Sequence, residues 1–175
     1  MSSQQGATTP LVRFEASLAE LDVPVTRAEP AAFEDTLEEI CRGSTVGTPL
    51  GFESVSLPGW VDDAPTPATL EAATTSVTPA RFGVADYGSV ALPSTRDGTE
   101  QVSLFVDLHV PVVRAGDVLP DMRTAMERLG PELRAGKSSI LATGPSATAD
   151  MGALVRGAHG PEEVHVVVLE GGADR

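Results

Sequence analysis

Apolar residues follow two different spacings along this 175-residue chain. Between Leu11 and Leu21 they recur every three or four positions, which is the spacing of one face of an α-helix. Residues 164–169 are apolar on both faces except for one histidine, as expected of a strand buried between two helix layers. Because helical and extended patterns alternate through most of the sequence, we expect an α/β protein.

The same spacings predict further elements, separated by turns rich in Gly and Pro. Helices are expected over residues 10–21, 30–42, 67–73 and 117–129. Strands are expected over residues 23–26, 45–47, 52–57, 102–106, 108–113, 140–142 and 164–169, with a hairpin around Asp86-Tyr87-Gly88. The hairpin makes the expected sheet mixed, although mostly parallel. Residues 10–170 are expected to form one layered domain, between a disordered N-terminus (1–9) and a frayed C-terminus (171–175).

The stretch from Ser138 to Leu169 carries the candidate site. A short apolar run, 140–142, is followed by a Gly144-Pro145-Ser146 turn, which we expect to open a helix, and a second turn at 157–161 leads into the last strand. Strand, helix and strand together make a βαβ unit. Open α/β sheets bind ligands where such a strand ends, so the first turn is a candidate binding site.

Three polar side chains, those of Ser146, Thr148 and Asp150, follow that first turn. One interpretation is structural: the two hydroxyls cap free N–H groups of the helix, and the carboxylate complements the helix dipole. The other is functional: the same N–H groups and hydroxyls form a pocket for lactate, pyruvate or a phosphate. A Walker phosphate loop is excluded, because its lysine and its glycine spacing are absent. The structural interpretation and the binding-pocket interpretation both stay open.

The three histidines and Asp86 are the remaining candidates for chemistry. His159 lies between small residues in the second turn, where it could bond local carbonyls, bind a carboxylate or exchange a proton near neutral pH. His109 and His165 fall on strands and are expected to be satisfied core histidines. Because no histidines have the spacing of metal ligands, we expect no metal site. Asp86 is either a turn residue or a carboxylate aimed into the same cleft as Ser146.

The chain is strongly acidic. Its formal net charge is −13, and Lys137 is its only lysine. Such a surface repels nucleic-acid phosphates and anionic membranes, so neither is expected as a partner. Scattered carboxylates, scarce lysine and an aromatic content of 4% resemble the composition of proteins from salt-accumulating halophiles.

The single cysteine, Cys41, excludes an intrachain disulfide, a Cys-rich zinc site and a self-contained iron–sulfur cluster, which generally needs about four protein ligands. It lies near the end of an amphipathic helix, so a buried or half-buried structural thiol is expected. No apolar run approaches the roughly 18 residues of a membrane span. Since the polar N-terminus also lacks a signal-peptide pattern, we expect a cytoplasmic protein that does not insert into membranes.

Three segments resemble the lactate-utilisation (LUD) domain family. The most specific one comprises Thr143–Asp150, Leu154-Val155, Gly157 and His159-Gly160-Pro161. Residues 83–90 lie where the family has an Ala-Glu-Thr-Gly segment, and residues 108–113 lie where it has a His-Ile-aliphatic strand. The resemblance covers residues 10–170 and departs from the family at Asp86-Tyr87, which stands in place of Glu-Thr.

The resemblance implies a fold like that of ribose-phosphate isomerases and coenzyme A transferases. It also implies a place in a three-component system that oxidises L-lactate to pyruvate, with iron–sulfur clusters in the partner subunits and no cofactor bound by this chain. The residues expected to bind a small acid are Gly144, Ser146, Thr148, Asp150, His159 and Gly160. The catalytic candidates are His159 and Asp86.

Three functions stay open at this point. The chain could be a subunit of a lactate-oxidising complex without its own redox centre, binding a small carboxylate or contacting the iron–sulfur subunits. It could instead be a stand-alone enzyme of the transferase or cyclo-ligase type, acting on an acyl or phosphorylated substrate, for which Asp86 is the best-placed acid. The third possibility is an assembly module without a ligand.

We predict that the chain loses structure when salt is dialysed away. In molar salt the Debye length falls to about 3 Å, which removes the self-repulsion caused by the net charge. Circular dichroism spectra in dilute buffer and in molar potassium chloride measure this loss directly. An unchanged spectrum would contradict the halophilic interpretation.

Overall fold

The computed structural model describes residues 9–150, 153–157 and 159–171. Its helices are α1 (Pro10–Glu20), α2 (Phe33–Ile40), α3 (Pro67–Glu71), α4 (Thr99–Leu104) and α5 (Met122–Arg134), with short 3-10 turns η1 (Pro30–Ala32) and η2 (Ala115–Asp117). Its strands are β1 (Val25–Ala28), β2 (Thr45–Gly47), β3 (Thr75–Pro79), β4 (Phe82–Val84), β5 (Ser89–Pro93), β6 (Leu108–Arg114), β7 (Val118–Leu119), β8 (Ser139–Thr143), β9 (Ala147–Asp150), β10 (Ala153–Arg156), β11 (Glu163–Val164) and β12 (Val166–Leu169). In these ranges no helix is both long and apolar enough to cross a bilayer.

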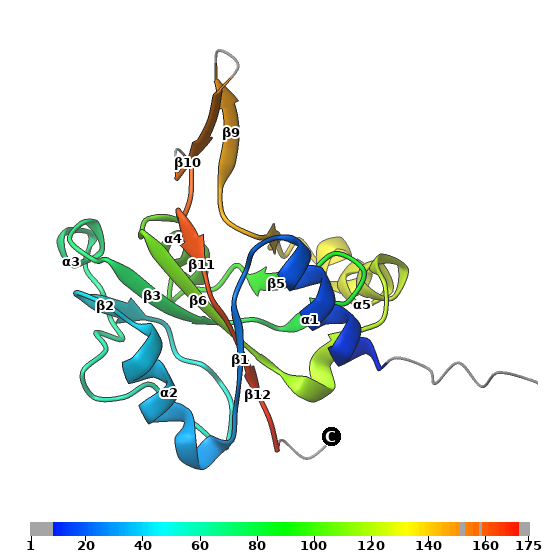
Figure 1. The fold of residues 1–175 in the computed structure, drawn as a ribbon, viewed down its shortest axis with the longest axis horizontal. Helices are drawn as coiled ribbons and strands as arrows, with labels where there is room; N and C mark the ends of the chain where they lie inside the picture. Colours follow the sequence, from blue (N-terminus) through cyan, green and yellow to red (C-terminus); the bar gives the residue numbers. More distant parts are fainter. Residues whose placement is uncertain (1–8, 151–152, 158, 172–175) are drawn as a thin grey trace, which may run out of the picture.

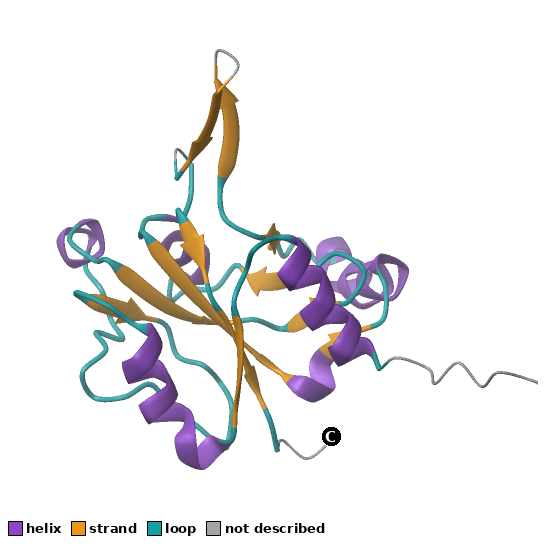
Figure 2. Ribbon diagram, viewed as in Figure 1, coloured by secondary structure: helices purple, strands orange, loops and turns teal. Residues whose placement is uncertain are grey.

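Parallel strands form the main sheet in the order β1-β12-β6-β3-β2, and β11 pairs with the start of β6. A second, smaller sheet has the order β7-β4-β5-β8 and contains the antiparallel β4–β5 hairpin. Helices flank the strands, as Figure 2 shows. The α/β class and the mostly parallel sheet are therefore confirmed, and the expected hairpin belongs to the second sheet.

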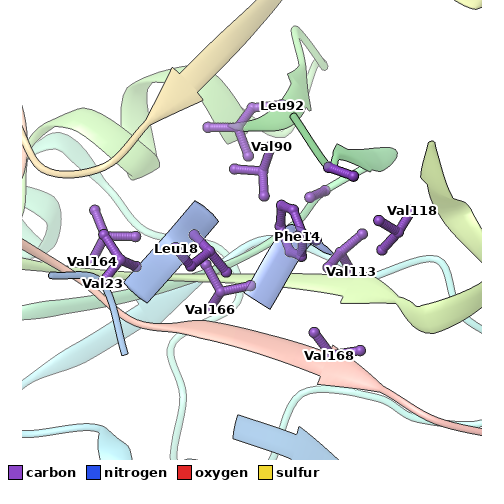
Figure 3. Packing of buried hydrophobic residues seen from close by; sticks show 12 residues of the cluster. Phe14, Leu18, Val23, Val90, Leu92, Val113, Val118, Val164, Val166 and Val168 are labelled. Carbon is purple, nitrogen blue, oxygen red and sulfur yellow. The ribbon is translucent and has the colours of Figure 1, made fainter. Parts of the chain in front are cut away.

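Strand β12 separates two apolar layers, because its side chains alternate between the faces of the sheet. Val166 and Val168 face α1 and the second sheet, and Phe14 of α1 packs in the same layer (Figure 3). Val167 faces the opposite layer, which contains Leu37 of α2. Because a fully buried side chain of this size contributes about 1.5–3 kcal/mol, packing onto the sheet holds both helices in place.

Pro111 lies in the middle of β6, where a missing N–H would normally break the sheet. The carbonyl of His109 accepts from the N–H of His165 on the β11 side. The carbonyl of Val112 accepts from the N–H of Ala80 on the β3 side. Since backbone groups alternate sides along a strand, Pro111 faces the break between β11 and β12, where no ladder bond is lost.

The first helix and its N-cap are both confirmed. The side chain of Thr9 accepts a hydrogen bond from the N–H of Val12 (3.3 Å), and Pro10 occupies the first helical position. The extended segments expected over 45–47 and 108–113 are β2 and β6. These elements carry strong local signals, which tertiary packing does not override.

Two expected strands are wrong. Helix α4 occupies most of residues 102–106, and its buried side chains Thr99, Val102 and Ser103 follow the helical spacing i, i+3, i+4. Residues 52–57 belong to a loop that packs apolar side chains against the α2 layer. In both places a short apolar run fits more than one structure, because burial alone does not specify an element.

The helix expected after Asp117 begins later, at Met122. Its N-cap is Asp121, whose Oδ1 accepts from the N–H of Thr124 (2.8 Å), whereas Asp117 forms ion pairs with two arginines. The helix also continues through Pro131, where we expected it to end. Proline removes only one helical hydrogen bond there, and the apolar face of α5 packs against the second sheet.

Strand β3 lies between β6 and β2, and apolar spacing does not predict it. Its residues Thr75, Ser76 and Thr78 are fully buried. Hydroxyl side chains fill the positions where a central strand normally carries Val, Ile or Leu. The pattern therefore resembles that of a loop, although the strand is central.

The helix expected between the turns 144–146 and 157–161 is wrong as well. Strands β9 and β10 form an antiparallel hairpin, in which Ala153 pairs with Asp150 and Arg156 with Ala147. Strand β8 runs antiparallel to β5 in the second sheet, so no crossover helix is needed before β11. The hairpin projects from the body of the molecule (Figure 1).

Candidate functional site

A cleft of about 230 Å³ opens between the main sheet and the second sheet. Apolar side chains of Leu92, Ile140 and Val164 line it, together with the polar side chains of Ser103 and His109. Strands β5, β6, β8 and β11 and the end of α4 contribute these residues. The cleft is therefore built from segments that are far apart in the sequence.

The cleft collects most of the residues expected to bind a small acid. Thr148 and Asp150 lie on β9, and their side chains fall outside the described part of the structure. The expected residues that line the cleft are Gly144, Ser146, His159 and Gly160.

Asp86 is not part of this lining. It lies in the turn between β4 and β5, where its Oδ1 is 3.0 Å from Nη2 of Arg13 on α1. Its carboxylate is 39% exposed. The structure therefore places Asp86 outside the cleft that contains Ser146, with a surface ion pair as its local role.

The cleft lies at the amino-terminal edge of the main sheet, not at the carboxyl edge where open α/β sheets bind ligands. Val164 of β11 pairs with His109, the second residue of β6, so both strands begin here. We expected the cleft at the carboxyl edge because residues 140–142, now part of β8, were assigned to the parallel sheet. Because β8 belongs to the second sheet, its end meets the start of β6.

Ser146 does not start a helix, so neither helix capping nor a helix-terminal anion site applies to it. Its N–H donates to the carbonyl of Pro161 (2.9 Å), and its carbonyl accepts from the N–H of Gly157 (3.1 Å). A Cβ atom at Gly160 would lie only 3.2 Å from Cβ of Ser146. The two turns that sequence analysis assigned to one site are thus joined by direct backbone contacts.

His109 is almost fully buried, at 2% exposure, and lines the inner part of the cleft. Its Nε2 lies 2.8 Å from Oγ1 of Thr78. Burial lowers the pKa of the imidazole to about 3, so the ring is neutral near pH 7. A neutral ring has one donor and one acceptor nitrogen, and Nδ1 has no protein partner among the described residues. Nδ1 can therefore bond a hydroxyl, a carbonyl or a carboxylate oxygen of a ligand.

Ser76 adds a second polar group beside His109. The two residues pair in register on β3 and β6, so their side chains project from the same face of the sheet. Oγ of Ser76 is buried and has no hydrogen-bond partner in the described part of the chain. A buried hydroxyl without a partner destabilises the folded state by about 1–3 kcal/mol. This region therefore keeps a polar group that lowers the stability of the protein.

The side chains that line the described cleft include no lysine, arginine, aspartate or glutamate. A phosphate carries close to two charges at neutral pH and normally needs a cationic partner. A carboxylate carries one charge, and about two or three neutral hydrogen-bond donors stabilise its charged form. The mixed apolar and neutral polar lining therefore fits a small carboxylic acid better than a phosphorylated compound.

The role of His109 is the main feature that sequence reasoning missed. The expected core position of His109 is confirmed by its burial and its bond to Thr78, but only Nε2 finds a partner among the described residues. The same side chain also lines the cleft, which the sequence alone does not predict. The available signal was that His109 is the one polar residue in the otherwise apolar run 108–113.

His165 provides a natural comparison on the opposite face of the main sheet. Its Nε2 lies 2.9 Å from Oγ1 of Thr26, and burial lowers the pKa of its ring. It lines a separate cleft of about 170 Å³, which also contains Arg42 and Glu163. His109 and His165 are thus both strand histidines bonded to a threonine, but only His109 lines the larger of these two clefts.

Cys41 is half-buried, which confirms the expected structural thiol. Burial raises the pKa of this thiol to about 12, so it stays protonated and unreactive at neutral pH. Among the described residues, no group of three or more His, Cys, Asp and Glu is arranged to hold a metal ion.

Comparisons with known proteins agree on one family. The LUD domain family profile matches residues 62–169. Lactate utilization protein C of Deinococcus radiodurans is 29% identical over 126 residues, which is 70% of this chain but only 59% of that protein. The uncharacterized protein YkgG of Escherichia coli K12 is 25% identical over 178 aligned positions, covering 97% of this chain and 72% of that protein.

A solved structure shows the same fold. The crystal structure of a DUF162 family protein from Deinococcus radiodurans superposes with a TM-score of 0.68, covering 91% of this chain and 96% of that chain. The sequence identity is 21%, so this similarity concerns the fold alone.

We predict that His109 makes the protein less stable in acid. The unfolded chain takes up a proton near the ordinary pKa of 6.5, whereas the folded chain does so only near the lowered value of about 3. Stability is therefore fully present above 6.5 and falls as the pH drops toward 3, by up to about 1.4 kcal/mol per pH unit. Urea unfolding of the wild type and of His109→Asn, at several pH values in this window, measures the difference in slope. Parallel slopes would contradict a neutral, buried His109.

Proposed function

This chain belongs to the LUD domain family, and on that premise we propose that it is a subunit of an L-lactate utilisation system that holds a small carboxylic acid in the cleft between its two sheets. The relative named lactate utilization protein C supports the physiological setting. The composition of the cleft supports the class of ligand. Lactate and pyruvate are the acids of that setting.

One observation carries the proposal. Two of the segments that carry the family resemblance, 108–113 and 143–161, are separated by 29 residues in the sequence yet meet at this cleft. One contributes the neutral ring of His109, and the other contributes Ser146 and His159. A binding site requires such segments to meet, whereas segments with independent structural roles have no need to meet.

The cleft favours an orientation for a 2-hydroxy or 2-oxo acid. The methyl group would contact the apolar wall formed by Leu92 and Val164. The oxygen on C2 would bond Nδ1 of His109, which is neutral and therefore binds by hydrogen bonding, not by charge. The carboxylate would lie toward the mouth, near His159, which is exposed.

Under this proposal the chain binds and orients the acid, and other subunits transfer the electrons. A histidine with a pKa of about 3 is a weak proton acceptor at neutral pH, so His109 is a poor general base. Cys41 is the only cysteine, so the chain cannot supply the four thiolates of an iron–sulfur cluster. We infer that such clusters, if the system uses them, lie in the partner subunits.

The lining of the cleft disfavours the stand-alone enzyme. A phosphorylated substrate would find no cationic side chain in the described lining, and Asp86 pairs with Arg13 outside it. A transferase of this type would need a carboxylate beside its substrate. The assembly function is compatible with ligand binding, because a partner protein can bind outside the cleft while the acid is held in it.

We predict that the wild-type chain binds L-lactate or pyruvate saturably, more tightly than inorganic phosphate. His109→Asn should weaken binding at least about tenfold, because the bond to C2 is lost, whereas His165→Asn should change it by less than about threefold. Isothermal titration calorimetry measures these affinities. His159→Ala alters an exposed side chain and should fold normally, so it tests the mouth of the cleft if His109→Asn unfolds.

Two results would contradict this assignment. One is the absence of saturable binding of either acid to the folded wild type. The other is equal loss of affinity in His109→Asn and His165→Asn, which would indicate a general effect of substituting a buried histidine.

A further inference from the structure

A second hollow, of about 480 Å³, lies on the outer side of His159 and Gly160. We call it the hairpin groove, because it runs between the end of α4 and the base of the β9–β10 hairpin. Leu104 and Phe105 line one side, and Asp107, Gly157 and Glu162 line the rest. His159, Gly160 and Leu104 also line the cleft for the small acid, so the two sites share a wall.

Phe105, on the apolar side of the hairpin groove, is the most exposed large apolar side chain among the described residues. Phe105 is 65% exposed and Leu104 is 37% exposed, whereas the next residue, Val106, is buried. The chain has only five phenylalanines. An exposed phenylalanine gives up the stabilisation that its burial in a monomer would provide. Exposed aromatic side chains beside a hollow are typical of sites that bind another protein.

The rim of the hairpin groove is acidic. Asp107 and Glu162 line it, and no lysine or arginine of the described chain does. Arg42 donates to both carboxylate oxygens of Glu163, at 2.6 and 3.0 Å, and it also interacts through its charge with Asp107 and Glu162. One cation thus faces three carboxylates, so the rim keeps a net negative charge beside the apolar side, which favours a partner that carries positive charge.

The hairpin itself offers backbone hydrogen bonds. Strands β9 and β10 pair only with each other in the described structure, so each has an outer edge without a neighbouring strand. A two-stranded hairpin is at best marginally stable in water, and a third strand would stabilise it. Figure 1 shows the hairpin projecting away from both sheets.

The base of the hairpin is held in one position. Gly157 has φ +77°, and a Cβ atom there would lie 2.3 Å from Cγ of Glu162. Both the backbone conformation and the contact therefore require glycine. The N–H of Gly157 also donates to the carbonyl of Ser146 (3.1 Å), so the two ends of the hairpin are tied together beside the groove.

We propose that the hairpin groove and the outer edge of the hairpin together bind an extended segment of another protein, with a large apolar side chain flanked by lysine or arginine. The apolar side chain packs on Phe105, and the basic residues pair with Asp107 and Glu162. The backbone of the segment extends the hairpin by one strand. A second copy of this chain is a poor occupant, because each copy carries a net charge of −13.

The test uses a short fluorescein-labelled peptide in which valine and threonine alternate around a central Lys-Phe-Arg. Fluorescence polarisation measures its binding to the full chain, at the lowest salt concentration at which circular dichroism shows the chain folded. A peptide with Glu-Phe-Glu at its centre is the control for charge. We expect Phe105→Ser to weaken binding of the basic peptide at least about tenfold, and Asp107→Asn to weaken it several-fold.

Met126→Ser is the matched control variant, because Met126 is 42% exposed on α5, away from the groove. It should bind the basic peptide like the wild type. Phe105→Ser should also bind pyruvate like the wild type, so this proposal and the proposed function fail separately. Absence of binding, equal binding of both peptides or equal effects of Phe105→Ser and Met126→Ser would overturn the proposal. A dimer in sedimentation that Phe105→Ser abolishes would also overturn it, in favour of a second copy.

Discussion

The side chains of β6 from Leu108 to Val113 are shielded from water on both faces of the main sheet. An apolar layer must therefore cover each face, and the rest of the fold supplies these two layers. Helix α2 and the loop that follows β2 cover one face, and α1 with the second sheet covers the other. His109, the one ionisable group among these six buried residues, can be buried because its ring stays neutral and bonds Thr78. The cleft between the two sheets reaches this strand at His109.

Elements with a strong local signal could be predicted from the sequence, and those shaped by their neighbours could not. The Thr9 cap and the apolar face of α1 specify a helix without reference to the remainder of the chain. Strand β3 carries buried hydroxyls whose partners come from other strands, so its own pattern does not identify it. Residues 147–156 have no pattern strong enough to distinguish a helix from a hairpin, and the placement of β8 in the second sheet decides between them.

The same distinction applies to the candidate site. The segments around Ser146 and His159 could be recognised because they lie close together in the sequence and carry the family resemblance. Their partner, His109, comes from a different strand, and its exposure to the cleft depends on how the two sheets meet. The position of the cleft at the amino-terminal edge was also unpredictable, since it follows from the antiparallel pairing of β5 and β8.

The cleft and the hairpin groove share the wall formed by Leu104, His159 and Gly160. A protein bound in the groove would therefore lie next to an acid held in the cleft. This arrangement suits a subunit that presents a small substrate to partners that carry out the redox step. Under the proposed function, a chain with one cysteine would bind the acid while its partners carry out the oxidation.

The most direct test of this account is the nitrogen NMR spectrum of the histidine rings during titration with pyruvate. If the acid binds beside His109, the resonance of its Nδ1 should shift saturably while the ring nitrogens of His165 stay unchanged. The ring of His109 should also remain neutral at the end of the titration. A shift confined to His165, or no shift at either ring when pyruvate is in excess, would contradict the central claim that this cleft binds a small acid.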